Sequence, residues 1–372
     1  MKPLIGVFVN NRFLLNSKGV LFASKLMQAN EVAGCSVCFF SPEDIDWDRR
    51  KINATVFHYP SGRRERKLCP FPDIIYDRGT AFPKGLQREV EAIRRRFKNV
   101  EKIRFINSGK LEKWPVIERL RQIKAVLPYL PATLLCRHLD DIRRMLHRFG
   151  YIFIKNSAGS GGTAVLSVKK MGNKYHLFFF RNGAHHQQVF NSVNDLLSGL
   201  AGMLDFKNEK YIVQQGIRLV KYHGRPLDLR ILLNKNKYGR WVAVYNQARV
   251  APKGAVITNL ALGGEVMDYA AIVSDLKEKY PYIPEDKKIR EVCIVIALAI
   301  EKMFGPFGEI GMDMAVDERG RIWLLEANSK PSKLPEDFIE DTRGVSPQFL
   351  MVLEYAAMLH RHSALASKAN NC

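Results

Sequence analysis

Two carboxylates and one amide late in the chain have the types and spacing of a magnesium site. Segment 308–330 reads GEIGMDMAVDERGRIWLLEANSK, and because turn-forming residues 317–320 separate two apolar runs, it predicts a β-hairpin. With a loop of two or four residues, Glu326 lies diagonally next to Asp313 on one sheet face, and Asn328 follows on that face. A three-residue loop would move Glu326 to the other face.

The surroundings of these side chains indicate what they could bind. Their neighbours in both runs are apolar, which predicts a strand pair covered on both faces. Two carboxylates there would repel each other and lose hydration. Mg²⁺ would offset the free-energy cost of this repulsion and lost hydration, because it takes oxygen ligands, usually one or two carboxylates with substrate phosphates. We therefore interpret Asp313, Glu326 and Asn328 as a magnesium set. The alternative is a sheet edge with its charges in water.

A glycine-rich segment is the second candidate for chemistry. Residues 152–168 read IFIKNSAGSGGTAVLSV, so Lys155 precedes the glycines and a β-rich run follows them. This is not a nucleotide P-loop, in which the lysine closes the loop and a helix follows. Such a loop can still cover phosphates, because glycines let backbone N–H groups approach closely and a lysine supplies charge. From this segment alone, a phosphate loop and an ordinary hairpin tip are equal alternatives.

Other catalytic signatures are absent from the sequence. It contains no G-x-S-x-G motif, and no G-x-G-x-x-G follows the first strand. Cys35 and Cys38 have CxxC spacing without a second metal-binding pair, so we interpret them as core cysteines. The formal net charge of +21 favours anionic ligands. The charged run 87–102 is typical of a solvated helix, so we do not expect a nucleic acid partner.

The helices and strands that must position these candidate site residues are predicted to form several domains. A chain of 372 residues is long enough for two or three domains. Apolar runs and a helical pattern over residues 4–40 predict a small α/β domain, and prolines at 127–135 mark a junction. The longest uncharged apolar run, 292–300, is too short to span a bilayer. The first residues resemble a strand rather than a signal peptide, so we expect a cytoplasmic protein without a membrane partner.

The order of these parts resembles the ATP-grasp superfamily. More narrowly, the phrases NSGKLEKW, LPYLPATLL, YIVQQGI, DLRILL, ARVAPKGAVITNLALGG and LLEANSKPS resemble the YheC/YheD family of endospore coat-associated proteins. The resemblance covers residues 72–359 and implies an α/β and α+β fold, in which a Rossmann-like pre-ATP-grasp domain precedes two subdomains that grip ATP. The division that it implies is an N-terminal domain 1–107, a linker and lid subdomain 108–214, a C-terminal subdomain 215–365 with the metal set, and a disordered tail 366–372.

The resemblance implies nucleotide contacts for two lysines, a flap and a hinge strand. Lys113 and Lys155 would contact the ATP phosphates below the flap. The flap itself would consist of Gly159, Ser160 and Gly162. The residues at the hinge strand would be Gln214, Gln215 and Ile217. Backbone groups there would form hydrogen bonds with the adenine edge, and an apolar side chain would pack on the adenine ring. Without the resemblance, the alternative for this strand is an ordinary buried strand end with satisfied glutamines.

The resemblance also implies groups near the transferring phosphoryl. Arg230, and Arg249 as a second candidate, would face it, because a planar guanidinium matches oxyanions. Asn259 would lie in a loop near the reacting centre. For each arginine alone, a surface position is the alternative. Asn156 and Ala164 stand where the flap usually has proline and glycine, which favours a less pliable flap.

The reaction implied by the resemblance is carboxylate activation, catalysed by positioning and electrostatics. We expect an ATP- and Mg²⁺-dependent ligase that joins a carboxylate to an amine, with a peptide or other acidic acceptor, and spore-coat proteins as partners. The alternatives are a phosphotransferase that acts on a hydroxyl and a structural spore-coat component that keeps the ATP-binding fold. We expect strand-end residues of the N-terminal domain to contribute to the acceptor pocket: Asn10, Asn11, Asp77 and Arg78. The closing phrase has Ser332 and Lys333 where glycine and arginine are expected.

Overall fold

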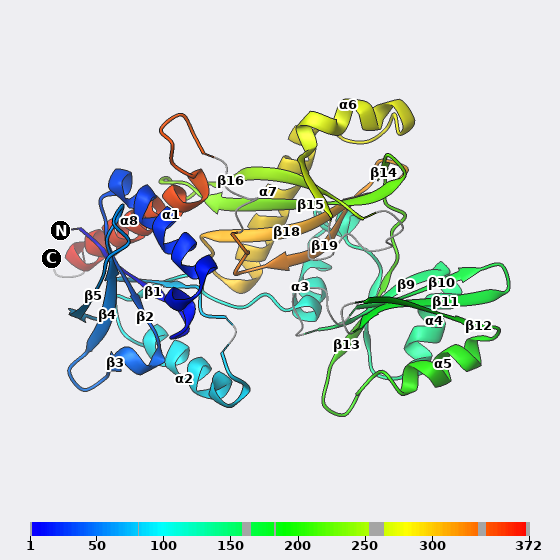
Figure 1. The fold of residues 1–372 in the computed structure, drawn as a ribbon, viewed down its shortest axis with the longest axis horizontal. Coiled ribbons are helices and arrows are strands. Elements are labelled where there is room, and N and C mark those ends of the chain that lie inside the picture. The colour runs from blue at the N-terminus through cyan, green and yellow to red at the C-terminus, as the bar shows by residue number, and fades with distance from the viewer. Residues whose placement is uncertain are drawn as a thin grey trace.

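Three β-sheets, each covered by helices, build the molecule (Figure 1). A computed structural model of the chain describes residues 2–80, 82–157, 165–181, 184–252, 264–333 and 340–369, with side chains as far as residue 363 except that of residue 84. The N-terminal sheet lies at one end of the molecule, and the lid sheet and the large sheet lie toward the other end. This architecture confirms the predicted combination of an α/β domain with two α+β subdomains.

The N-terminal sheet has the strand order β3-β4-β2-β1-β6-β7, and β5 pairs with β4. Its strands are β1 (Leu4–Phe8), β2 (Ser36–Phe40), β3 (Ile45–Asp46), β4 (Lys51–Phe57), β5 (Arg64–Pro70), β6 (Ile74–Asp77) and β7 (Arg104–Ile106). Helix α1 (Ser17–Ala33) covers one face and α2 (Gln87–Lys98) the other. Cys35 and Cys38 are buried there as free thiols, which confirms them as core residues.

Local sequence signals explain where α1 begins and ends. The side chain of Asn16 accepts a hydrogen bond from the Gly19 backbone N–H, which caps the first turn. Gly34 ends the helix in a left-handed conformation, φ 66°, that glycine adopts without steric cost. α1 thereby carries the chain from β1 to the parallel neighbour β2, the β-α-β unit that the sequence predicts.

The C-terminal helix α8 (Pro347–Ala369) packs beside α1 on the N-terminal sheet. Phe349 and Leu353 share one apolar core with Phe22 and Leu26 of α1. The predicted division places this helix in the C-terminal subdomain, and the structure differs because α8 buries its apolar residues against the N-terminal sheet. The helix also continues to Ala369, so the first part of the predicted disordered tail is helical.

The lid is an antiparallel sheet with the order β12-β11-β10-β9-β13-β8. Its strands are β8 (Thr133–Cys136), β9 (Tyr151–Asn156), β10 (Val165–Met171), β11 (Lys174–Arg181), β12 (Ala184–Phe190) and β13 (Tyr211–Gln215). Helices α4 (Leu139–Phe149) and α5 (Val193–Ala201) cover the face that carries Ile152 and Ile154. Because side chains alternate along a strand, Lys155 lies on the opposite face.

The large sheet has the order β17-β16-β15-β18-β19, and β14 pairs with β15. Its strands are β14 (Lys221–Tyr222), β15 (Arg225–Lys235), β16 (Trp241–Val250), β17 (Glu265–Asp268), β18 (Glu309–Val316) and β19 (Ile322–Asn328). One face packs on α3 (Lys113–Leu120), α6 (Tyr269–Lys279) and α7 (Asp286–Phe304), and its core includes Met312 and Met314. Asp313, between them, faces the other side. Short 3-10 helices are η1 (Phe13–Leu15), η2 (Pro42–Asp44), η3 (Lys84–Leu86) and η4 (Leu127–Tyr129).

The β18–β19 hairpin confirms the predicted strand pair but has a different loop. Val316 pairs with Ile322, so the loop holds residues 317–321, an odd number. An odd loop alone would put Glu326 out of phase with Asp313. A bulge next to Asp313 shifts the register by one residue, however, and Asp313 pairs directly with Glu326 rather than diagonally.

Candidate functional site

The candidate site is a row of charged side chains across neighbouring strands of the large sheet. Arg230 on β15 pairs in register with Asp313 on β18, and Asp313 pairs with Glu326 on β19. Arg230 Nη1 donates to Asp313 Oδ1 at 2.8 Å. Lys113 Nζ, at the start of α3, lies 3.2 Å from Glu326 Oε1. The strand register therefore brings together four residues that the sequence places in three distant segments.

A second arginine extends this row. Arg249 Nη2 lies 3.3 Å from Asp313 Oδ1. Arg249 also donates two hydrogen bonds to Asp228, at 2.7 and 2.8 Å, in a bidentate arrangement. Asp228 is the first residue of the DLRILL phrase, and its role as a partner of Arg249 could not be predicted from the sequence.

The charges of this row stabilise one another. Burial would raise the pKa of the Asp313 carboxyl, but the guanidinium groups of Arg249 and Arg230 outweigh it and lower the pKa. Burial likewise lowers the pKa of Arg249, whereas Asp228 and Asp313 together raise it above its ordinary value. Asp313 and Arg249 therefore stay ionised around neutral pH, which suits electrostatic interaction with a ligand rather than proton transfer.

Lys155 reaches toward this row from the lid sheet. Its Nζ donates to Gln214 Oε1 at 2.7 Å, and Gln214 Nε2 donates to Thr133 Oγ1 at 3.1 Å. Burial lowers the pKa of Lys155 to about 8, and the neighbouring cation Lys113 adds to this effect, while Glu326 opposes it. A phosphate placed at this amine would restore the charged form, because it supplies the anion that burial leaves missing.

This pKa predicts how nucleotide affinity depends on pH. If Lys155 binds phosphate, affinity should be highest below about pH 8 and should fall by up to about tenfold per pH unit above it, because the neutral amine loses the attraction. Fluorescent nucleotide titrations at several pH values measure this slope. Lys155→Arg should flatten it, since a guanidinium stays charged. An unchanged slope in that variant would assign the pH dependence to another group.

The three residues expected at the hinge strand make different contacts in the structure. The side chain of Gln214 is buried and bonds to Lys155 and Thr133. Gln215 donates its backbone N–H to Ala132 O at 2.8 Å. Ile217 is buried against Ala315 and Trp323. Because Ala315 lies two residues beyond Asp313 on the same strand face, this apolar cluster borders the carboxylates.

The proposed metal ligands share one sheet face. Gly311, two residues before Asp313, pairs with Asn328, two residues after Glu326. A Cβ on Gly311 would lie 2.7 Å from Pro331 Cβ and 3.2 Å from the Arg230 guanidinium carbon, so glycine leaves the space that these two side chains occupy. Two carboxylates and one amide oxygen suit Mg²⁺, whose other ligands are commonly water and phosphate oxygens. Within the described ranges, no group of three or more His, Cys, Asp or Glu could hold a metal alone.

Four expected site residues fall outside the described ranges: Gly159, Ser160, Gly162 and Asn259. Their roles stay predictions from the resemblance. The same holds for Ala164.

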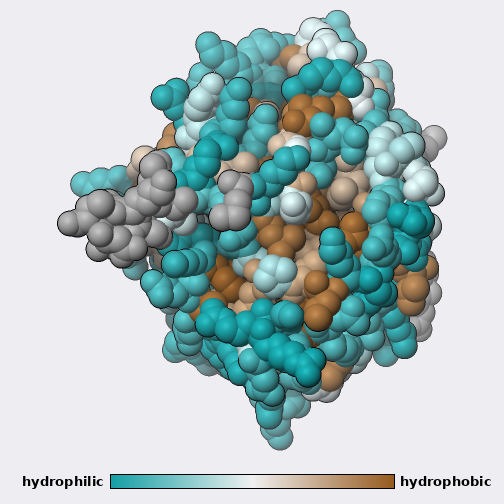
Figure 2. All heavy atoms as spheres, turned by 90° about the vertical axis from the view of Figure 1, so that its left-hand side faces the viewer, coloured by the Kyte–Doolittle hydropathy of each residue, from teal (hydrophilic) through white to brown (hydrophobic). Residues whose placement is uncertain are grey.

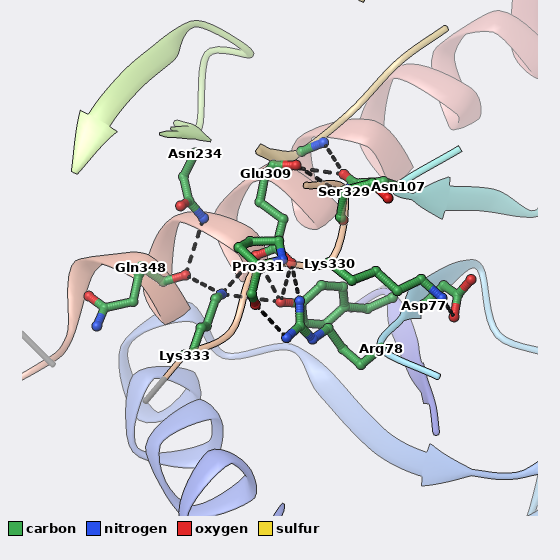
Figure 3. Close-up of polar contacts among 12 residues, drawn as sticks. Asp77, Arg78, Asn107, Asn234, Glu309, Ser329, Lys330, Pro331, Lys333 and Gln348 are labelled. Carbon is green, nitrogen blue, oxygen red and sulfur yellow. Dashed lines mark hydrogen bonds and ion pairs between the residues drawn. The ribbon is translucent and has the colours of Figure 1, made fainter. Parts of the chain in front are cut away.

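Asp77 and Arg78, expected at an acceptor pocket, instead join the N-terminal sheet to the segment after Asn328 (Figure 3). Asp77 Oδ1 lies 2.7 Å from Lys330 Nζ, and Arg78 Nη1 lies 2.6 Å from Glu309 Oε1. Lys333 Nζ lies 2.8 Å from Glu309 Oε2, and these two side chains are 0% and 1% exposed. Lys333 therefore has a structural partner on β18.

Asn107 completes this junction through its side-chain amide. Its Oδ1 accepts from the backbone N–H groups of Gly308 and Glu309, and its Nδ2 donates to the Glu309 and Ser329 carbonyls. One buried amide thus holds the start of β18 and the end of β19, the two strands that carry Asp313 and Glu326.

Removing the central charge of this junction should destabilise the fold. Glu309→Gln would leave Arg78 and Lys333 as buried cations without their carboxylate, at an expected cost of about 3–5 kcal/mol in unfolding free energy. Equilibrium urea unfolding measures this cost. The matched control is Glu285→Gln, which removes an exposed partner of Lys277 and should cost less than about 1 kcal/mol. Equal losses in both variants would contradict a special role for the junction.

Among the described residues, no helix combines the length and apolar character needed to cross a bilayer.

Comparisons with known proteins identify the fold and the family of this chain. The chain is 26% identical over 339 residues to the endospore coat-associated protein YheD of Bacillus subtilis (strain 168), covering 89% of this chain and 73% of that protein. The D-alanine-D-alanine ligase from Coxiella burnetii matches with a TM-score of 0.54 at 13% identity, over 100% of this chain and 99% of that chain.

A second solved structure is the ATP-grasp ligase PsnB, complexed with a phosphomimetic variant of its minimal precursor, Mg and ADP. It matches with a TM-score of 0.52 at 11% identity, over 97% of this chain and 99% of that chain. At such identities the two ligases show the fold alone. The family model of YheC/D-like ATP-grasp proteins matches residues 102–359, which contain the lid and the row of charges, and this chain belongs to that family.

Proposed function

We propose that this protein is an ATP- and Mg²⁺-dependent ligase that activates a carboxylate as an acyl phosphate and joins it to an amine. The observation that supports the proposal best is the row of Arg230, Asp313 and Glu326 on the face toward Lys155. Four cations, from Lys113, Lys155, Arg230 and Arg249, accompany three carboxylates, from Asp228, Asp313 and Glu326. The excess positive charge suits a polyanionic nucleotide.

The proposed mechanism relies on positioning and fixed charge. Asp313, Glu326 and Asn328 would hold Mg²⁺, which when bound neutralises charge on the ATP phosphates. Lys113 and Lys155 would bind phosphate oxygens from the large sheet and from the lid.

The phosphoryl transfer itself would take place beside the arginines. The substrate carboxylate oxygen attacks the γ-phosphorus, the bond to the β-phosphate oxygen breaks, and ADP leaves. Arg230 would stabilise the charge on the transferring group, and Asp228 would orient Arg249 next to it. An amine then attacks the acyl carbon, the bond from that carbon to the phosphate oxygen breaks, and inorganic phosphate leaves with the proton that the amine loses. Because both guanidinium groups stay protonated, they act as electrostatic partners and not as acids.

Hydroxylamine trapping tests the reaction class. The protein is incubated with ATP, Mg²⁺, hydroxylamine and a panel of peptide and amino-acid carboxylates, and hydroxamates and ADP are quantified by mass spectrometry. A ligase should yield hydroxamate and ADP in equal amounts. ADP formed with phosphate transferred to a hydroxyl would establish a phosphotransferase and overturn the proposal. Tight ADP binding without any turnover would instead favour a structural component that keeps the fold.

The name of the relative suggests where acceptors could be sought. Because YheD is named as endospore coat-associated, we propose spore-coat proteins as acceptors or partners of this chain. Incubation of the protein with a spore-coat extract and ATP should produce coat peptides that lose one water for each bond formed. Extracts that stay unchanged while small carboxylates react would place the acceptor elsewhere.

A further inference from the structure

Helix α7 carries the apolar run 292–300, which the proposed function leaves unexplained. Its inner face packs in the core of the large sheet, where Ile289 and Ile296 are buried. Its outer face is apolar as well, because Val295 and Leu298 are 39% and 54% exposed. No other helix among the described residues exposes two large apolar side chains. A helix that is apolar on all sides is typically buried on all sides, so the outer face of α7 suits a contact with another molecule.

Four exposed residues of α7 form one stripe along the helix. They follow one another at intervals of four, three and four residues: Glu291, Val295, Leu298 and Lys302. Alternating intervals of three and four place side chains on one side of a helix, and two helices pack through this spacing in coiled coils. The apolar pair occupies the middle of this α7 stripe, and opposite charges occupy its two ends.

The α7 stripe is complementary to itself when two copies run antiparallel. A two-fold axis midway between Val295 and Leu298 places each Val295 opposite the Leu298 of the other copy. The same axis places each Glu291 opposite the Lys302 of the other copy, because the two charges lie at equal distances along the chain from the apolar pair. Such an isologous contact joins the same patch of two identical molecules.

The charged ends of the stripe are accessible for this contact. Lys302 makes no hydrogen bond or ion pair within the described ranges. Lys288 Nζ lies 4.0 Å from Glu291 Oε2, one turn away, and both side chains are more than half exposed, at 60% and 52%. A parallel arrangement would place like charges together at both ends, and their repulsion would disfavour it. The charges therefore favour an antiparallel pair of helices.

We infer that the α7 stripe binds the α7 stripe of a second copy of this chain in antiparallel orientation. Val295 and Leu298 of both copies form the centre, and two ion pairs between Glu291 and Lys302 flank it. A single pair of helices buries less surface than the roughly 1,600 Å² of a standard interface, so we expect a dissociation constant on the order of 10–100 µM. Because α7 covers the face of the large sheet opposite to Asp313, the inference does not depend on the proposed function.

Sedimentation velocity of the full chain tests the inference. The concentration is varied from about 1 µM to about 500 µM, which brackets the expected dissociation constant, and the protein should pass from monomer to dimer. Glu291→Lys and Lys302→Glu should each weaken dimerisation at least about tenfold, because each places like charges at both ends of the contact. A parent protein that stays monomeric over this range would overturn the inference.

A mixture of the two charge variants tests the antiparallel orientation. In a heterodimer of Glu291→Lys with Lys302→Glu, opposite charges meet again at both ends. The equimolar mixture should therefore dimerise with a dissociation constant within about threefold of the parent value, although each variant alone does not. Failure of the mixture to dimerise would contradict the antiparallel stripe.

The matched control is Arg95→Glu, which makes the same change of charge as Lys302→Glu at an exposed position of α2. It should alter the dissociation constant by less than about twofold. All the replaced side chains are exposed, so the variants should fold, and urea unfolding verifies this. Equal weakening by Arg95→Glu and Lys302→Glu, or a dimer that none of the variants weakens, would overturn the inference.

Discussion

Replacement of Asp313 by asparagine should lower the rate of ADP formation by about a thousandfold. Asp313 lies at the centre of the charged row, between Arg230 and Glu326, and contacts Arg249 as well. An amide keeps the shape of the side chain but removes the charge that would hold Mg²⁺. Bound Mg²⁺ would stabilise the transition state by several kcal/mol, and each tenfold change in rate corresponds to about 1.4 kcal/mol. Loss of this stabilisation therefore corresponds to the expected thousandfold decrease in rate.

The control for this variant comes from the same hairpin. Glu318→Gln makes the same chemical change at an exposed position in the 317–321 loop and should leave the rate within about twofold. Steady-state ADP release at several Mg²⁺ concentrations measures both variants, and urea unfolding verifies that each is folded. If Asp313→Asn keeps the parent rate and the parent Mg²⁺ requirement, the prediction that Asp313, Glu326 and Asn328 bind Mg²⁺ is wrong.

Replacement of Arg230 by methionine should also reduce turnover at saturating ATP by about a thousandfold or more. Arginines that stabilise a transferring phosphoryl group contribute about 10³–10⁵ in rate. Asp313 would still contact Arg249 in this variant, so the carboxylate keeps a cationic partner and the fold should persist. The nucleotide dissociation constant should change far less than the rate, because the proposed contact is strongest in the transition state.

Two further variants make this result interpretable. Arg225→Met, on the same strand, removes an ion pair with Glu265 that lies away from the row and should have little effect on turnover. Arg230→Lys keeps the charge but loses the planar fork and should fall between the parent and Arg230→Met. If Arg230→Met weakens nucleotide binding while saturated turnover stays intact, Arg230 is a ground-state binding residue.

Much of the site could be predicted from the sequence because strand periodicity determines which side chains share a face. The apolar runs around Asp313 and Glu326 correctly predict a hairpin with both carboxylates on one face. The register could not be predicted, because a bulge depends on how β18 and β19 pack on their surroundings. The direct pairing therefore arises from a five-residue loop plus a bulge, two irregularities that compensate each other.

Contacts between distant segments were less predictable. The bidentate pair of Asp228 and Arg249 requires the register of β15 and β16. Similarly, the bond from Lys155 to Gln214 depends on two lid strands that lie far apart in the sequence. Residue types alone could not reveal these partners, since many polar residues lie at comparable strand positions. The fold could still be inferred from the order of the sequence phrases that resemble the YheC/YheD family, because that order reflects several such strand pairings together.

The position of α8 means that the core of the N-terminal unit needs residues from both ends of the chain, and the ribosome synthesises these residues at different times. Figure 2 shows the face of the N-terminal unit that is turned away from the other two sheets, where apolar side chains gather inside a polar surround. During synthesis, β1 and α1 leave the ribosome early, yet Phe349 and Leu353, which complete their core, follow only on the order of tens of seconds later. The nascent N-terminal unit therefore exposes apolar surface for most of translation.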